Sequence, residues 1–247
     1  MIETNVITKP VASIDKRRER FFYTGMAAAI LLTVFAGFSR TYYLRPIFQT
    51  QPLIPLLHVH GLIFTSWLAL FLIQTGLVAA KRTRTHMSLG IAGGVLAALM
   101  VVIGTLTAIL RARTGAVPPG FSSPLIFLTI PLVDMLVFAI LISGAFYFRR
   151  RADIHKRLML LATIGILPAA VARLPFDFIL QYGPIAFFGL ADLFIIPVLI
   201  WDLATRGRPH RATVLAAALI VISQPVRLVI GNTHAWIVFA TWLTQWT

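Results

Sequence analysis

Apolar runs of about twenty residues recur along most of this 247-residue chain. A run of this length crosses about 30 Å of hydrocarbon as an α-helix, and a helix satisfies its backbone hydrogen bonds internally, as a lipid-embedded segment must. Hydrophobic residues make up 58% of the sequence and charged residues 12%, so no separate soluble domain fits. The sequence predicts an all-α polytopic transmembrane helical bundle of about seven spans: 22–38, 57–80, 87–110, 125–148, 157–178, 185–204 and 212–231.

Both ends of the chain differ from the predicted spans. Residues 1–20 are too polar for a signal peptide, and we expect a cytoplasmic N-terminal segment followed by one transmembrane domain over residues 21–247. The apolar tail 235–246 contains Trp236, Trp242 and Trp246. Because indole rings favour the headgroup level, the tail is predicted to be an interfacial helix on the external side of the membrane.

Basic residues mark one side of the predicted bundle. Sixteen of the 22 Lys and Arg residues, starting with Lys9, fall in the N-terminal segment and in three alternate turns, against four on the other side. The positive-inside rule therefore predicts a cytoplasmic N-terminus, in a multi-pass protein of the bacterial inner membrane. The net charge of +14 then reflects topology and affinity for the anionic lipid bilayer. Nucleic acid is excluded as a partner, because the basic residues form short turns rather than one continuous face.

Charged residues inside the predicted spans indicate a site. Ionisable groups are costly at bilayer depth and are kept where they pair, line a cavity or do chemistry. Counting from the span ends puts all five charged residues in the outer half of the bilayer. Gln224 shares a helical face with one of them, Arg227. We predict a buried ligand site there; interhelical ion pairs are the alternative, and they leave one acid unmatched. The candidate ligand-binding residues are Asp134, Arg173, Asp177, Asp192, Gln224 and Arg227.

Three cytoplasmic turns share a basic segment followed by a histidine near the start of the returning helix: KRTRTHMSLG with His86, RRRADIHKRLM with His155 and TRGRPHRATVL with His210. One interpretation is structural, with N-caps at Thr85 and Asp153 and imidazoles at headgroup level. The other is haem ligation. A b-type haem in a bundle takes two imidazoles from different helices at similar depth, and His86 and His155 meet that requirement.

Further histidines lie toward the outer side. His58 and His60 open the second span in LLHVHGLIFTSW, and residues two apart on a helix point about 200° from one another. In an extended segment the two rings could bind zinc or copper if a third ligand were near. His60 lies on the face predicted to point inward, together with Trp67, and pairs with His234 as the outer candidates for haem.

The motifs HxHGxxF, KxRxHMSLG and DIHKRLMLLA resemble those of a group of uncharacterised bacterial polytopic inner-membrane proteins with histidine-led hairpins, distantly similar to di-haem cytochrome b bundles. The resemblance covers mainly residues 38–175. It implies haem binding and electron transfer. The chain departs from the di-haem pattern because no span carries two histidines about a dozen residues apart.

Three classes of function follow. The first is a redox protein with haem b, in which the outer charged residues stabilise haem propionates or a quinone-like headgroup. The second is a small-molecule transporter or sensor, and the third a metal-dependent membrane enzyme with zinc or copper. Each class allows association with other membrane proteins. The absence of cysteine excludes iron–sulfur clusters and thiolate metal sites.

Overall fold

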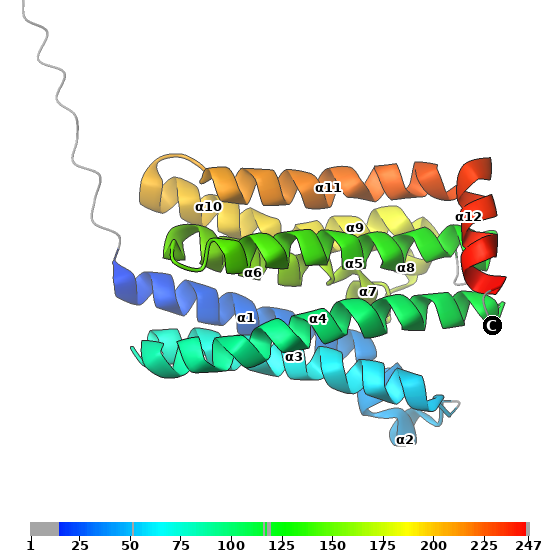
Figure 1. Cartoon of the computed structure of the whole chain (residues 1–247), viewed down its shortest axis with the longest axis horizontal. Coiled ribbons are helices and arrows are strands. Elements are labelled where there is room, and N and C mark those ends of the chain that lie inside the picture. Colours follow the sequence, from blue (N-terminus) through cyan, green and yellow to red (C-terminus); the bar gives the residue numbers. More distant parts are fainter. Residues whose placement is uncertain (1–14, 51, 116, 118–119, 246–247) are drawn as a thin grey trace, which may run out of the picture.

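The computed structural model of the chain describes residues 15–50, 52–115, 117 and 120–245, so Lys9 and Trp246 lie outside the described residues. The regular elements of the described part are helices (Figure 1). In chain order they are α1 (Lys16–Phe38), the π-helix η1 (Ser39–Tyr43), α2 (Arg45–Phe48), α3 (Pro55–Ala79), α4 (Thr83–Arg113), α5 (Pro124–Tyr147), α6 (Ala152–Gly165), α7 (Pro168–Val171), α8 (Asp177–Tyr182), α9 (Pro184–Asp192), α10 (Ile195–Arg206), α11 (Arg211–Gly231) and α12 (His234–Gln245).

Seven helical segments are long and apolar enough to cross a membrane, as predicted. Continuous helix extends past the apolar core of several spans, because polar first and last turns remain helical where they reach the headgroup level. The seven segments are Lys16–Tyr43, Pro55–Ala79, Thr83–Arg113, Pro124–Tyr147, Ala152–Val171, Pro184–Arg206 and Arg211–Gly231.

The fifth span differs most from its predicted range of 157–178. It begins five residues earlier, at Ala152, and ends at Val171. Its early start escapes a hydropathy reading because the first turns, ADIHKR, are polar. Its early end has a local cause, since Pro175 disfavours helical backbone in the residue before it.

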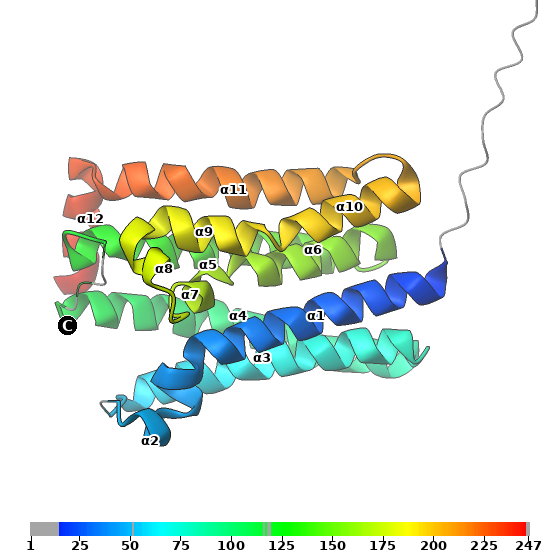
Figure 2. The ribbon, with the colours of Figure 1, turned by 180° about the vertical axis from the view of Figure 1, so that it is seen from behind.

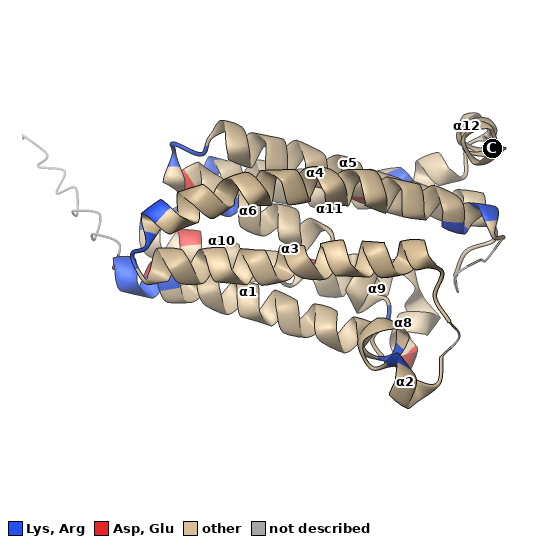
Figure 3. Ribbon diagram, turned by 60° about the horizontal axis from the view of Figure 1, so that its bottom comes forward, with Lys and Arg blue, Asp and Glu red and all other residues tan. Residues whose placement is uncertain are grey.

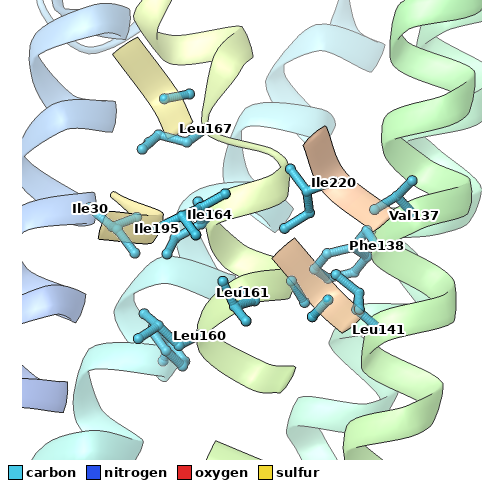
Figure 4. Packing of buried hydrophobic residues seen from close by; sticks show 14 of the residues in the cluster. Ile30, Val137, Phe138, Leu141, Leu160, Leu161, Ile164, Leu167, Ile195 and Ile220 are labelled. Atoms are coloured by element: carbon cyan, nitrogen blue, oxygen red, sulfur yellow. The ribbon is translucent and has the colours of Figure 1, made fainter. Parts of the chain in front are cut away.

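Spans that follow one another in the chain pack as antiparallel pairs, whereas α6 and α11 run in the same direction. Contacts join α1 to α3, α3 to α4, α4 to α5, α5 to α6, and α11 to both α5 and α6 (Figures 1 and 2). Helix α6 is the most central span, with 67% of its apolar window buried. Its residues Leu161 and Ile164 share a buried cluster with Ile30 of α1, Phe138 of α5 and Ile220 of α11 (Figure 4). This packing fixes the depth of the polar groups that α6 carries.

Helix α12 lies across one end of the bundle rather than along it (Figures 1 and 2). Its 12 residues reach only about 18 Å, which is too short for a span. Trp236 Nε1 donates to the carbonyl of Leu125 at 2.8 Å, which ties α12 to the start of α5. The prediction of a surface helix in place of an eighth span is confirmed.

Basic residues gather at the end of the bundle where α1 begins, as Figure 3 shows in blue. We call this the basic end; it contains the start of α1 and the turns 80–82, 148–151 and 207–210. The end covered by α12 is the opposite end.

Candidate functional site

Asp134 and Arg227 form a buried ion pair toward the opposite end. Arg227 Nη1 donates to Asp134 Oδ1 and joins α11 to α5, and the two side chains are 2% and 8% exposed. Ser223 holds the guanidinium on its other side: Arg227 Nε donates to the Ser223 carbonyl at 3.1 Å and Nη2 donates to Oγ at 2.7 Å. The remaining donors are thus largely satisfied, which is the condition for a buried pair to persist.

Asp192 is held by an amide instead of a cation. Gln224 Nε2 donates to Asp192 Oδ1 at 2.8 Å and links α11 to the last residue of α9. Asp192 is half-buried and forms no ion pair within the described part of the chain. The sequence anticipated one unmatched acid among three aspartates, whereas two of them, Asp177 and Asp192, form no ion pair among the described residues. Asp134, Asp192, Gln224 and Arg227 are connected through adjacent turns of α11, and we call them the opposite-end cluster.

Arg173 and Asp177 do not belong to this cluster, and their predicted position inside a span is wrong. Arg173 follows the end of α7 and is exposed, with its guanidinium over the ring of Phe38 at 4.6 Å. Asp177 is the exposed first residue of α8. The cause is the helix break at residues 172–176, around Pro175, which ends the span before either charge.

A second buried ion pair, missed by the sequence reading, lies toward the basic end. Arg157 of α6 and Asp202 of α10 are 1% and 0% exposed, and Arg157 Nε donates to Asp202 Oδ1 at 3.0 Å. Asp202 Oδ2 also accepts from the His210 N–H at 3.0 Å and from the Thr213 hydroxyl at 2.5 Å. The sequence places Arg157 in the basic turn segment RRRADIHKRLM, at the cytoplasmic surface. A run of five basic residues hid the single member that points inward, although Asp202 inside an apolar run was a usable signal.

The rings of His86 and His155 are neighbours at the basic end, in an edge-on arrangement. Their ring centroids are 6.4 Å apart and their planes are inclined by 77°. Each Nδ1 is bonded within its own helical hairpin: that of His86 to Gln74 Oε1 of α3, and that of His155 to the carbonyl of Ala145 of α5, both at 2.8 Å. A carbonyl oxygen only accepts, so His155 carries its proton on Nδ1.

The Nε2 atoms of His86 and His155 have no hydrogen-bond partner among the described residues. Hydrogen bonding at Nδ1 with a bare Nε2 is the arrangement found in metal-ligating imidazoles, whose second nitrogen is oriented by an acceptor. Space is available one turn after His86, where a Cβ on Gly90 would meet no atom within 4 Å. The predicted inner pair is therefore brought together.

His210 has a different role, and the predicted N-caps are wrong. Helices α4 and α6 begin before Thr85 and Asp153, whereas His210 itself caps α11, its Nδ1 accepting from the Ala212 N–H at 3.0 Å. His210 Nε2 lies 3.1 Å from Asp153 Oδ2. These two bonds fit the neutral ring protonated on Nε2. Burial, aided by the nearby Arg157 and Arg206, lowers the pKa of His210 against the opposing effect of Asp153.

The outer histidines do not come together. His60 is half-buried and stacks on Phe64 at 4.1 Å, while His58 is exposed, 6.2 Å from the ring of Tyr42. Both lie within α3, so the extended segment needed for a joint metal site is absent there. His234 is exposed at the start of α12. The described residues include no group of three or more His, Asp or Glu side chains able to hold a metal ion.

Comparison of the chain with protein-family models, with curated proteins and with solved structures found no match. The candidate chemistry consequently rests on the residues and their geometry.

Proposed function

We propose that this chain is a multi-pass redox protein of the bacterial inner membrane that binds one b-type haem between His86 and His155. The observation that carries the proposal is the neighbouring pair of imidazoles, each oriented through Nδ1 and unpartnered at Nε2 among the described residues. The basic end is then the cytoplasmic side, in keeping with the positive-inside rule.

The separation of the two rings would allow His86 and His155 to hold one metal centre together. Two imidazoles that share one metal ion, with metal–nitrogen bonds of about 2 Å, have ring centroids roughly 6 Å apart. The observed centroid distance is 6.4 Å. Both residues sit in the first turn of their helices, so the two ligands lie at the same depth.

The number of ligands favours haem over zinc or copper. Protein sites for zinc take three or four side-chain ligands, and no such group occurs among the described residues. A haem supplies four equatorial nitrogens of its own and asks the protein only for axial ligands. The di-haem arrangement is not expected, because no span carries a second histidine about a dozen residues away.

The surroundings of the pair fit an anionic, flat cofactor. Two basic turns adjoin the histidines and offer cations to the propionate carboxylates; their members are Lys81, Arg82, Arg84, Arg149, Arg150 and Arg151. Arg227, predicted for that role, is instead engaged by Asp134. The open space beside Gly90 lets a planar ring system approach the helix backbone closely.

A bound haem would supply one-electron chemistry. The residues of the chain would hold it and set its surroundings. Gln74 and the Ala145 carbonyl accept from Nδ1 of the two ligands, which fixes the rings and raises their basicity. The apolar helices α4 and α5 limit the access of water.

The test is an absorption spectrum of protein purified after expression with ample haem supply. We expect a Soret band that His86→Ala and His155→Ala each abolish and that His58→Ala, an exposed control, retains. In His86→Gly, added imidazole should restore part of the band, which a purely structural hydrogen bond would not produce. Gly90→Leu should lower the haem content, whereas Gly25→Leu, also in open space, should not.

A colourless wild-type protein under these conditions would refute the proposal. Elemental analysis of the same sample separates the remaining classes predicted from the sequence. Stoichiometric zinc or copper would indicate a metal-dependent enzyme, and absence of any metal together with ligand-dependent thermal stability would indicate a transporter or sensor.

A further inference from the structure

A groove of about 420 Å³ runs along the outside of the bundle between α9–α10 and α11. Its walls are apolar except for one acid, Asp192. Lining residues Leu193 and Ile222 are 53% and 61% exposed, so in a membrane the groove opens to the acyl chains. Asp192 lies about 12 Å from the start of its span, eight residues after Pro184. An occupant must therefore arrive from within the bilayer.

The groove carries more hydrogen-bond acceptors than donors. Asp192 Oδ1 accepts from Gln224, while Oδ2 has no partner among the described residues. Pro225, inside α11, lacks the N–H that would bond the carbonyl one turn earlier, that of Val221. Val221 lines the groove. Acceptors without donors at this depth are costly when they face hydrocarbon alone.

We propose that the groove binds the headgroup of a membrane-soluble quinol, with Asp192 accepting a hydrogen bond from a quinol hydroxyl. The choice of a quinol rests on the proposed redox function. A quinol matches the groove in three respects: it is apolar enough to reach mid-bilayer, its flat ring suits an apolar cleft, and its two hydroxyls donate where the groove only accepts. An acyl chain would fill the same volume but leave the acceptors unpaired.

The experiment measures the unfolding temperature of the purified protein in lipid nanodiscs against the mole fraction of decylubiquinol, kept reduced under anaerobic conditions. We expect a saturable rise. Asp192→Asn keeps an acceptor for Gln224 but loses the charge, and should weaken apparent affinity about tenfold or more. Ala218→Phe, which fills the groove, should abolish the response. Ala98→Phe, on an exposed face of α4, should leave it unchanged.

Decylbenzene, which has the same chain and no hydroxyl, provides the second arm. A response to decylbenzene equal to that to decylubiquinol, or unchanged affinity in Asp192→Asn, would mean that only acyl chains occupy the groove and would overturn the proposal. The unfolding temperature without ligand reports whether each variant has folded. Loss of the quinol response in a protein with an intact Soret band would refute this site alone. Saturable, Asp192-dependent binding without a Soret band would support the site and refute the haem function.

Discussion

Replacing Arg157 by Met should be among the most destabilising single changes in this chain. The substitution keeps an unbranched side chain of similar length but removes the guanidinium that Asp202 bonds. Asp202 is 0% exposed, so its carboxylate remains inside the bundle without a cation. The cost of stranding one partner of a buried pair is about 3 to 5 kcal/mol. The His210 N–H and the Thr213 hydroxyl still donate to the carboxylate, which favours the lower part of that range.

Reversible unfolding in mixed micelles measures this change in the free energy of unfolding. For a chain of this size the expected loss corresponds to a fall in unfolding temperature of roughly 6 to 20 °C. Arg149→Met is the matched control: Arg149 is exposed in the turn that precedes α6, and its replacement should change stability by less than about 0.5 kcal/mol.

A double variant decides whether the pair itself is responsible. Arg157→Met combined with Asp202→Leu removes both charges and should recover at least half of the lost stability, because no buried ion remains unpaired. Equal stability of Arg157→Met and Arg149→Met would refute the reasoning. So would strictly additive effects in the double variant, since the two side chains are in direct contact.

Three further predictions follow from the same structure. Arg227→Leu should destabilise the protein by about 3 to 5 kcal/mol while Arg206→Leu has little effect, and comparable unfolding temperatures for the two variants would contradict the burial of the Asp134 pair. Because the folded-state pKa of His210 lies below its usual value, the folded chain binds fewer protons than the unfolded chain, so stability should fall as pH drops below about 6.5. Thermal unfolding of His210→Asn, which keeps an N-cap, should show a shallower pH dependence than wild type; an identical slope would exclude His210 as its source. Topology reporters should read as cytoplasmic at the basic end and as external at the opposite end, and any reversal would overturn the proposed orientation. The cytoplasmic fusion points are 84, 152 and 209, and the external ones are 50, 117 and 182.

Hydropathy alone predicts the number of spans because a membrane leaves the backbone few alternatives. It fails at span ends that carry charges, as at the start of α6, where tertiary contacts permit a polar turn to be helical and partly buried. Arg157 shows why: whether an arginine faces solvent or an acid on another helix depends on α10, about 45 residues away in the sequence. An acid inside an apolar run, such as Asp202, indicates that a buried partner exists, but the sequence does not identify Arg157 as that partner.

The candidate sites likewise differ in how much of each one the sequence predicts. The depth of Asp134 and Arg227 could be counted from the span ends, and their opposite charges made a pair the simplest arrangement. Arg173 was misplaced because a helix break of five residues is invisible to an apolar count. The proximity of His86 and His155 requires two hairpins to dock in register, and the repeated turn motif indicates equal depth but not that the rings are neighbours.

The hydrogen bonds of those two histidines have a consequence for biogenesis. His86 is oriented by Gln74 within the α3–α4 hairpin, and His155 by Ala145 within the α5–α6 hairpin. Each ring can therefore be oriented by its own pair of helices, without a contact to the other pair. Docking of α4 against α5 then brings two already oriented imidazoles together. A molecule that binds both imidazoles would link the α3–α4 hairpin to the α5–α6 hairpin. The rate at which the two hairpins assemble would then depend on the supply of that molecule.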